Sequence, residues 1–360
     1  MTPQHGNARH ANSPHTDGSH ANAPLLGAVF VAVASILWGT TGTAATFAPS
    51  VSPLAIGAVA MGLGGLLQAL YAATSIARQR SGLARRWRLV LLAAAAVAVY
   101  PLAFYSSMHL SGVAVGTVVS IGSAPIAAAL IERCADGKPL TRRWVTGAVL
   151  GVGGAALLSF AGRTPAGHGA AASGTVPEWA STVGIMLGLV AGGTYALYSW
   201  AAHRLIGGGV SSRAAMGSVF GLGGLLLMPV LALTGAPLLQ SWTNFAVGAY
   251  MALVPMFAGY VLFGWGLARI HASTATSISL LETVVAAVLA VLMVGERLPA
   301  LGWLGAAVVL ASLFILTPGT PRSSVKKPAG GKESGSAGFL PPPAPAEGAP
   351  VPEDAGSQRH

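Results

Sequence analysis

Long stretches of apolar residues alternate with short polar stretches along most of the chain. Ten such runs each approach the roughly 20 residues that an α-helix needs to cross the hydrocarbon core of a bilayer. The runs are continuously apolar, unlike the strands of a membrane barrel, in which apolar and polar residues alternate. The pattern therefore predicts an all-α polytopic membrane protein with ten transmembrane helices. We place them at about 25–47, 52–76, 87–108, 112–133, 141–160, 181–203, 211–233, 243–268, 272–294 and 300–317.

Composition agrees with this fold class. Hydrophobic residues make up 53% of the 360 positions and charged residues only 8%, whereas about a quarter of a soluble domain is charged. The chain has one cysteine, Cys134, so neither an internal disulfide nor a thiolate metal cluster is expected.

The basic residues are distributed unevenly between the connections. With ten spans, 18 of the 20 Lys and Arg residues fall on one side, and only Arg163 and Arg297 fall on the other. Cytoplasmic loops carry the excess of Lys and Arg in inner-membrane proteins, so we expect both termini to be cytoplasmic. The same asymmetry explains the net charge of +10 without a nucleic-acid partner.

Both ends of the chain are polar. Residues 1–24 carry His5, His10, His15 and His20 at intervals of five, and residues 318–360 are rich in Pro, Gly and Ser. These segments contain too little apolar surface to fold, so we interpret them as disordered tails. Metal capture by the His-rich segment is the alternative interpretation.

The two halves of the apolar region resemble each other. A shift of 159 residues aligns the segment from Ser120 to Leu150 with the segment from Ser279 to Val309, and it sets Ser123 over Glu282. We therefore divide the chain into repeats at 25–160 and 181–317, joined by a loop at 161–180. Each repeat has five spans, and an odd number means that the second copy enters from the opposite face. Inverted repeats are typical of secondary transporters, whose binding site lies near the bilayer midplane.

At two places the sequence resembles a known family. The stretch "ILWGTTGTAATFAP" in the first run, and "SLLETVVAAVLAVLMVGERLPALGWLGAAVVLAS" across the last two, are similar to EamA-type members of the drug/metabolite transporter superfamily. The resemblance covers about residues 25–317 and implies an inner-membrane carrier of small organic solutes, most often an exporter. The family often has Pro directly after the acid of the ninth span. Thr283 stands there in this chain, which argues against a helix break at the acid.

Glu282 is the main candidate functional residue. It lies about eleven residues into the ninth run, where a charged group costs roughly 3 kcal/mol, and no Lys or Arg lies at that depth. Two interpretations stay open. Glu282 is either a neutral acid that ties helices together by hydrogen bonds, or it faces a water-filled cavity and binds a proton, a cation or an amine. Ser279, on the same helical face, and Ser123, its repeat counterpart, are the expected neighbours.

Deep aromatic residues complete the expected site. Trp38 and its repeat counterpart Tyr195 are placed to form a cavity wall that stacks on a planar or cationic solute, with core packing as the alternative. Tyr100, Phe104, Phe257 and three further tyrosines add aromatic surface in spans 3, 6 and 8. From spans 1, 3, 4, 6, 8 and 9 we expect the substrate-binding residues Trp38, Thr41, Tyr105, Ser123, Tyr195, Tyr198, Tyr260, Ser279 and Glu282.

These observations predict a secondary transporter of small organic solutes such as amino acids, metabolites or drugs. Efflux by alternating access is the expected mode, with Glu282 coupling protons to solute. Uptake or uniport by the same fold, a membrane enzyme acting on lipid-linked substrates, and a passive channel are the alternatives. No second carboxylate is expected inside the spans, and no cofactor or metal is expected. The lipid bilayer and a small-molecule substrate are the predicted partners, while substrate identity and oligomeric state stay open.

Overall fold

The computed structural model of the protein describes residues 23–111, 113–161, 178–294 and 298–316, and these residues form helices and connections without strands. The His-rich segment and the Pro-rich segment lie outside the described residues, as does nearly all of the loop expected at 161–180. Helices already begin at Ala23 and Glu178, two or three residues before the predicted repeats begin.

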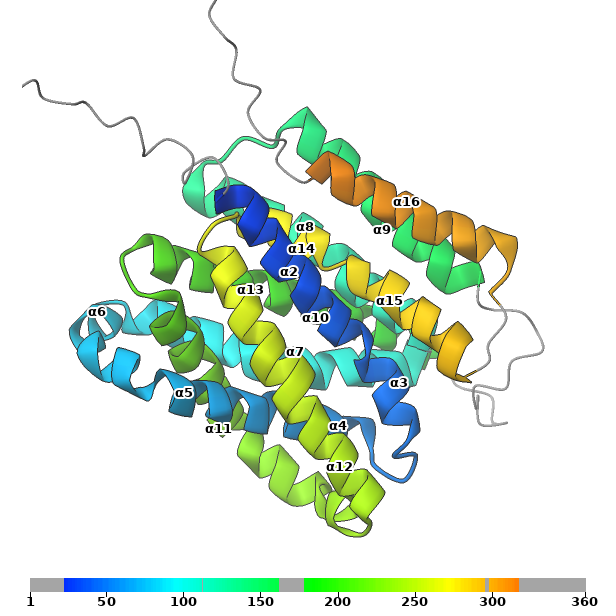
Figure 1. Ribbon diagram of the computed structural model, residues 1–360, viewed down its shortest axis with the longest axis horizontal. Coiled ribbons are helices and arrows are strands. Elements are labelled where there is room, and N and C mark those ends of the chain that lie inside the picture. The colour runs from blue at the N-terminus through cyan, green and yellow to red at the C-terminus, as the bar shows by residue number, and fades with distance from the viewer. Residues whose placement is uncertain (1–22, 112, 162–177, 295–297, 317–360) are drawn as a thin grey trace, which may run out of the picture. The chain divides into compact units, whose positions relative to one another are not determined.

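Helices occupy all five apolar runs of the first half (Figure 1). They are α2 (Ala23–Gly39), α3 (Thr41–Thr46), α4 (Pro53–Gly57), the π-helical turn η1 (Ala58–Leu63), α5 (Gly64–Arg78), α6 (Arg80–Arg85), α7 (Trp87–Ser111), α8 (Val113–Asp136) and α9 (Arg142–Ala161).

The second half is also helical throughout its described part. Its elements are α10 (Glu178–Gly207), α11 (Ser212–Thr234), the 3₁₀ turn η2 (Ala236–Leu239), α12 (Trp242–Met251), the π-helical turn η3 (Ala252–Ala258), α13 (Gly259–Leu267), α14 (Ala272–Ile278), α15 (Leu281–Leu289), the π-helical turn η4 (Ala290–Val294) and α16 (Ala300–Leu316).

Eight stretches are long and apolar enough to cross a membrane, judged by length and composition among the described residues. They correspond to runs 1 to 4 and 6 to 9 of the sequence. The remaining two runs form α9 and the 17-residue α16, which lie side by side in Figure 1. The chain is therefore a helical, multi-pass membrane protein, while a total of ten crossings and the inverted arrangement stay predictions.

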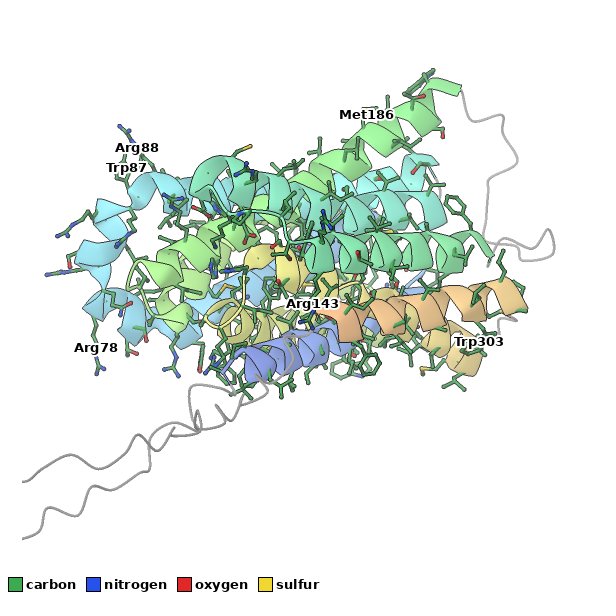
Figure 2. The ribbon with its side chains drawn as sticks, turned by 90° about the horizontal axis from the view of Figure 1, so that it is seen from above. Arg78, Trp87, Arg88, Arg143, Met186 and Trp303 are labelled. Carbon is green, nitrogen blue, oxygen red and sulfur yellow. The ribbon has the colours of Figure 1, made fainter. Side chains whose placement is uncertain are left out.

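Four basic connections lie together at one end of the bundle, which we call the basic end. Three contacts and one ion pair link them: Arg86 Nη2 donates to the Gly208 carbonyl over 2.7 Å, Ser211 N–H donates to Gln79 Oε1 over 2.9 Å, Arg204 pairs with Asp136, and Lys138 Nζ lies 3.1 Å from His271 Nδ1. Figure 2 shows Arg78, Trp87 and Arg88 together at this end, with Met186 and Trp303 at the other.

The core lies where α10 packs against α7, α8, α11 and α13. Small residues line the helix contacts, which lets the backbones approach closely. Six buried aromatic side chains fill the centre of the core: Trp38, Tyr195, Tyr198, Phe220, Tyr260 and Phe263.

The expectation that the spans hold no second carboxylate is wrong. The helix α8 continues to Asp136, three residues beyond the predicted end of its run. Glu132, which already falls inside the predicted run 112–133, and Asp136 both lie within a membrane-spanning stretch, and Glu132 is only 4% exposed.

Candidate functional site

The span that carries Glu282 is broken just before that residue. Its two helices, α14 and α15, are separated at Ser279 and Leu280. The Ser279 and Thr283 hydroxyls donate to carbonyls three residues back, over 2.8 and 2.7 Å, and such bonds compete with the regular helical pattern. The absence of Pro at position 283, which argues against a break at the acid, does not prevent one: the helix is interrupted at Ser279 and Leu280, and Thr283, in the first turn of α15, donates to the Leu280 carbonyl.

The first span is broken in a similar way. Thr40 separates α2 from α3, and the hydroxyls of Thr40 and Thr41 donate to the carbonyls of Leu37 and Trp38 over 2.6 and 2.7 Å. Hydroxyl-to-carbonyl bonds over three residues thus mark both interruptions. Discontinuous helices at mid-membrane depth are where transporters commonly build their sites.

The two interruptions lie against each other. A Cβ atom added at Gly39 would lie 2.9 Å from the Glu282 carbonyl oxygen and 2.6 Å from Val285 Cβ. Only a residue without a side chain lets α2 approach the start of α15 so closely. The Gly residue of the first span thereby fixes where the backbone of Glu282 sits.

A third irregularity positions Trp38. In the π-helical turn η3, the Gly259 N–H bonds to the Val254 carbonyl rather than to that of Pro255, so the Pro255 carbonyl is left free of its usual helical partner. Trp38 Nε1 donates to it over 2.9 Å. A Cβ atom at Gly259 would come within 2.7 Å of that indole nitrogen, so this Gly is required for the contact.

These elements surround a cavity of about 50 Å³ in the middle of the bundle. A single water needs roughly 10–15 Å³, whereas sites that enclose a drug-sized ligand have roughly 300–1,000 Å³. The described conformation is therefore contracted, and a larger solute requires the helices to separate. The lining residues are Trp38, Thr41, Gly57, Ala60, Met61, Tyr100, Pro101, Phe104, Tyr105, Tyr195, Met256, Tyr260 and Glu282.

Of the nine residues expected to bind substrate, the structure brings six to this cavity: Trp38, Thr41, Tyr105, Tyr195, Tyr260 and Glu282. The other three lie outside it. Ser123 packs against Gly192 and donates to the Ser120 carbonyl over 3.3 Å. Tyr198 lies behind the wall, with its hydroxyl 2.8 Å from that of Tyr260. Ser279 is fully buried in the helix break.

Sequence reasoning assigned the wrong span to one side of the cavity. Span 4, expected to line it, contributes no lining residue, whereas span 2 contributes Gly57, Ala60 and Met61. These three are small or apolar and carry no signal of function in the sequence. They reach the cavity where α4 passes into the π-helical turn η1.

Aromatic rings form a continuous wall around the cavity. Successive ring centroids lie 4.8 to 6.4 Å apart along the series Tyr260, Trp38, Tyr195, Tyr100, Phe104 and Tyr105. These separations are typical of interacting aromatic pairs. Ring faces attract organic cations and stack on planar groups.

The carboxylate of Glu282 faces this cavity without a partner. The side chain is half-buried, and it makes no hydrogen bond or ion pair with any residue that the structure describes. The cavity lining includes no Lys or Arg. An unpaired acid at this depth is costly, and it is placed to take up a proton or to contact a cationic group.

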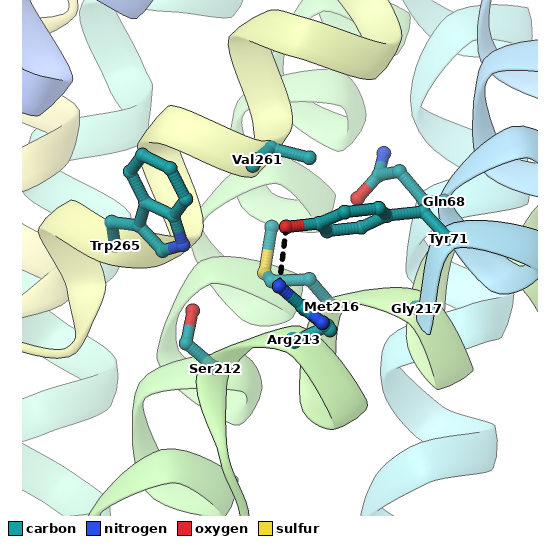
Figure 3. Close-up of a pocket in the computed structure, with 8 residues that line it drawn as sticks. All are labelled: Gln68, Tyr71, Ser212, Arg213, Met216, Gly217, Val261 and Trp265. Carbon is teal, nitrogen blue, oxygen red and sulfur yellow. Dashed lines mark hydrogen bonds between the residues drawn. The ribbon is translucent and has the colours of Figure 1, made fainter. Parts of the chain in front are cut away.

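A second pocket is far smaller. It measures about 10 Å³, enough for about one water, and lies between α5, α11 and α13. In Figure 3, the Arg213 guanidinium lies over the Tyr71 ring, 4.3 Å from its centroid, and Nη2 donates to the Tyr71 hydroxyl over 2.7 Å. Arg213 is therefore already engaged by Tyr71. The residues that line this second pocket are Gln68, Tyr71, Ser212, Arg213, Met216, Gly217, Val261 and Trp265.

Known proteins resemble this chain over most of its length. The family model described as "EamA-like transporter family" matches residues 25–160 and again residues 182–317. The chain is 32% identical over 290 residues to "Uncharacterized transporter YwfM" of Bacillus subtilis (strain 168), a match that covers 80% of this chain and 93% of that protein. A solved chain described as "Crystal structure of protein" is similar with a TM-score of 0.64 at 19% identity, covering 82% of this chain and 96% of that one. At that identity, the likeness to the solved chain concerns the fold alone.

Proposed function

Because the chain belongs to the EamA-like transporter family, we propose that it is a secondary transporter of small organic solutes. Amino acids, other metabolites and drugs are the candidate classes, and efflux across the inner membrane is the proposed direction. Ten spans in two inverted five-helix repeats, with both termini cytoplasmic, form the proposed architecture.

The observation that carries this proposal is the unpartnered carboxylate of Glu282 in the central cavity. One carboxylate holds either a proton or a cationic group of the solute, but not both. Binding of one therefore displaces the other, which is the simplest chemical basis for exchanging protons against solute. We assign Glu282 the coupling role on this ground.

The aromatic wall supports an organic solute with a positive or planar group. Trp38, Tyr260 and Tyr195 present three neighbouring rings to the cavity that Glu282 also lines. A ring face and a carboxylate both favour an ammonium group, and the rest of the lining is mostly apolar. Solutes that carry an amine and an apolar body fit this combination best.

Alternating access is supported by where the cavity lies. Trp38 and Tyr105 come from the first sequence repeat, and Tyr195, Tyr260 and Glu282 come from the second. A site that both halves share is exposed to one side or the other when the halves shift against each other.

The test is solute flux in proteoliposomes that contain the purified protein. A thermal-shift screen against amino acids and organic amines first identifies a solute that raises the melting temperature. The labelled solute should then show saturable counterflow, and an imposed pH gradient should drive its accumulation. Comparing vesicles of the two orientations establishes the direction of transport.

Glu282→Gln is the decisive variant, because it keeps the size of the side chain and removes the charge. We expect it to abolish accumulation driven by the pH gradient. Ser312→Ala is the matched control, since the Ser312 hydroxyl bonds within α16, away from the cavity. Full, pH-dependent transport by Glu282→Gln would refute the coupling role, and linear, non-saturating flux by the unmodified protein would indicate a channel.

A further inference from the structure

Eight residues form a polar cluster at the basic end, outside the cavity. They come from the end of α8 and the residues after it, from the last turns of α10, and from the start of α14. We call this group the end cluster: Glu132, Asp136, Lys138, Trp200, His203, Arg204, His271 and Ser273.

Glu132 is the buried member of the end cluster. Its Oε2 accepts from the Ser273 hydroxyl over 2.6 Å, and its Oε1 accepts from the Ser273 backbone N–H over 3.4 Å. Within the described part of the chain, no Lys or Arg pairs with it. A carboxylate buried against a single serine is a costly way to hold two helices together permanently.

The other contacts tie the same three elements. Asp136 accepts from Trp200 Nε1 over 2.8 Å and pairs with Arg204, which joins α8 to α10. His203 Nδ1 donates to the Leu267 carbonyl over 2.7 Å, which joins α10 to the end of α13. Polar contacts of this kind are replaced by contacts with water when the helices separate, so breaking them costs much less than exposing an apolar interface of the same area.

Buried hydroxyls also lie between α8 and α10. The hydroxyls of Ser199 on α10 and of Ser120 on α8 are buried and make no hydrogen bond with the described residues. Tyr195 lines the cavity, and Ser199 lies one turn further along α10, next to Trp200. Buried polar groups without partners are rare in a permanent core, and the hydroxyls of Ser199 and Ser120 would be satisfied if α8 and α10 parted to admit water.

The half-helix α14 connects the end cluster to the site. Ser273 lies in its first turn, and the helix break that follows Ile278 leads directly to Glu282. Because α14 has only seven residues, it spans roughly 10 Å at 1.5 Å per residue. Ser273 and Glu282 therefore lie on consecutive short segments of one span, separated by a single helix break.

The opposite end of the bundle is packed differently. Asn244 Nδ2 donates to Ser50 Oγ over 3.0 Å, and an apolar cluster fills the space around the start of α4 and α12. Its largest buried members are Val51, Ile56, Val59, Leu238, Val247 and Met251. The basic end thus combines the polar pairs of the end cluster with apolar packing that includes Leu205, Leu267 and Ile270, whereas the opposite end is mainly apolar.

From these contacts we infer that Glu132 is a positioning residue for transport. Its bonds to Ser273 hold α14 against α8 and close the solute pathway at the basic end, and they break when that end opens. This inference rests on the proposed function, since it assigns a gate to the same pathway. Glu132 does not touch the solute, and it acts through the position of α14.

The test measures opening directly, without transport. In a Cys134→Ser background, Ala60→Cys places a thiol in the cavity lining. A membrane-impermeant maleimide is then applied from the basic end in one set of vesicles and from the opposite end in another. Glu132→Leu and Ser273→Ala should each raise the labelling rate from the basic end roughly tenfold, the effect expected when a hydrogen bond to a charged group is lost. Labelling from the opposite end should not rise.

A double variant and a control sharpen the result. Glu132→Leu combined with Ser273→Ala should show about the same rate as either single variant, because both remove the bond between the Ser273 hydroxyl and the Glu132 side chain. Ser277→Ala, whose hydroxyl bonds within α14 to the Ser273 carbonyl, should leave the rate unchanged. Three results would each overturn the gate: labelling rates that rise equally from both ends, single-variant effects that add in the double variant, or labelling rates that do not change. The two proposals fail separately. If the Glu132 and Ser273 variants raise labelling as expected but Glu282→Gln keeps pH-driven transport, the coupling role of Glu282 is refuted and the gate is not.

Discussion

The indole nitrogen of Trp38 donates a hydrogen bond of 2.9 Å to the carbonyl oxygen of Pro255. The two residues lie 217 positions apart, one in each sequence repeat. Pro255 can accept this bond because the π-helical turn η3 withdraws its usual partner. The bond thus fixes one ring of the aromatic wall relative to a helix of the other half, at the edge of the cavity that Glu282 faces.

Trp38→Phe should therefore destabilise the protein by more than the smaller apolar area of the Phe ring accounts for. The variant keeps an aromatic ring but leaves the Pro255 carbonyl buried without a donor, which costs about 1–3 kcal/mol. Thermal unfolding in detergent measures the change. Trp242→Phe is the control, because Trp242 is 79% exposed and should shift the melting temperature little. Equal shifts for the two variants would show that the Trp38 bond contributes nothing to stability.

The helix positions could be predicted from the sequence, because an apolar run of about 20 residues has few ways to satisfy its backbone in a bilayer other than as a helix. The irregularities within the spans could not. The breaks at Ser279 and Thr40 go with local hydroxyl-to-carbonyl bonds that Ser and Thr also make in continuous helices, and the carbonyl freed by the π-helical turn at Pro255 meets its donor, Trp38, 217 positions away. Thr283 illustrates the limit, since comparison with a family pattern suggested a straight helix where hydroxyl bonds produce a turn.

The candidate site was predictable in part for a similar reason. An isolated acid such as Glu282 and a deep Trp such as Trp38 stand out in an apolar run. Glu132 did not, because it lies at the end of its run beside Arg133, where a charged residue is ordinary. Only the fold brings it against Ser273, on a span 141 residues away.

Gly39→Ala should disrupt the site more than any other change of one methyl group in the first span. The added Cβ would approach the backbone carbonyl of Glu282 to 2.9 Å, and backbone cannot move aside as a flexible side chain can. We expect the free energy of unfolding to fall by about 3 kcal/mol, the upper end of the usual cost of overpacking. Counterflow should be lost as well.

Gly42→Ala is the matched control for this change. No atom lies within 4 Å of a Cβ added at Gly42, and replacing Gly by Ala within a helix stabilises it by up to about 1 kcal/mol. Its melting temperature should stay equal or rise slightly, with counterflow retained. If Gly39→Ala behaved like Gly42→Ala, the close approach of α2 to the Glu282 backbone would not matter for the site.

Opening at the basic end should depend on pH through His271. Burial lowers the pKa of the His271 imidazole below its usual value of about 6.5, and the neighbouring Lys138 ammonium lowers it further. His203 on α10 acts in the same direction, while Glu132 and Asp136 on α8 oppose it. The net shift is downward, so the closed arrangement binds a proton on His271 more weakly than an open, hydrated one does.

The sign of the pH effect follows from this difference. Above about pH 6.5 the imidazole is neutral in both arrangements, and the stabilisation of the closed one is fully present. As the pH falls below that value, protonation favours the open arrangement, and it also removes the acceptor that Lys138 Nζ approaches to 3.1 Å. Maleimide labelling of Ala60→Cys from the basic end should therefore rise as the pH is lowered from 7.5 to 5.5, after correction for the reactivity of the thiol itself.

His271→Asn should flatten that pH profile. His109→Asn, at the end of α7 and away from the end cluster, should leave it unchanged. A profile that stays the same in His271→Asn would assign the pH dependence to another group.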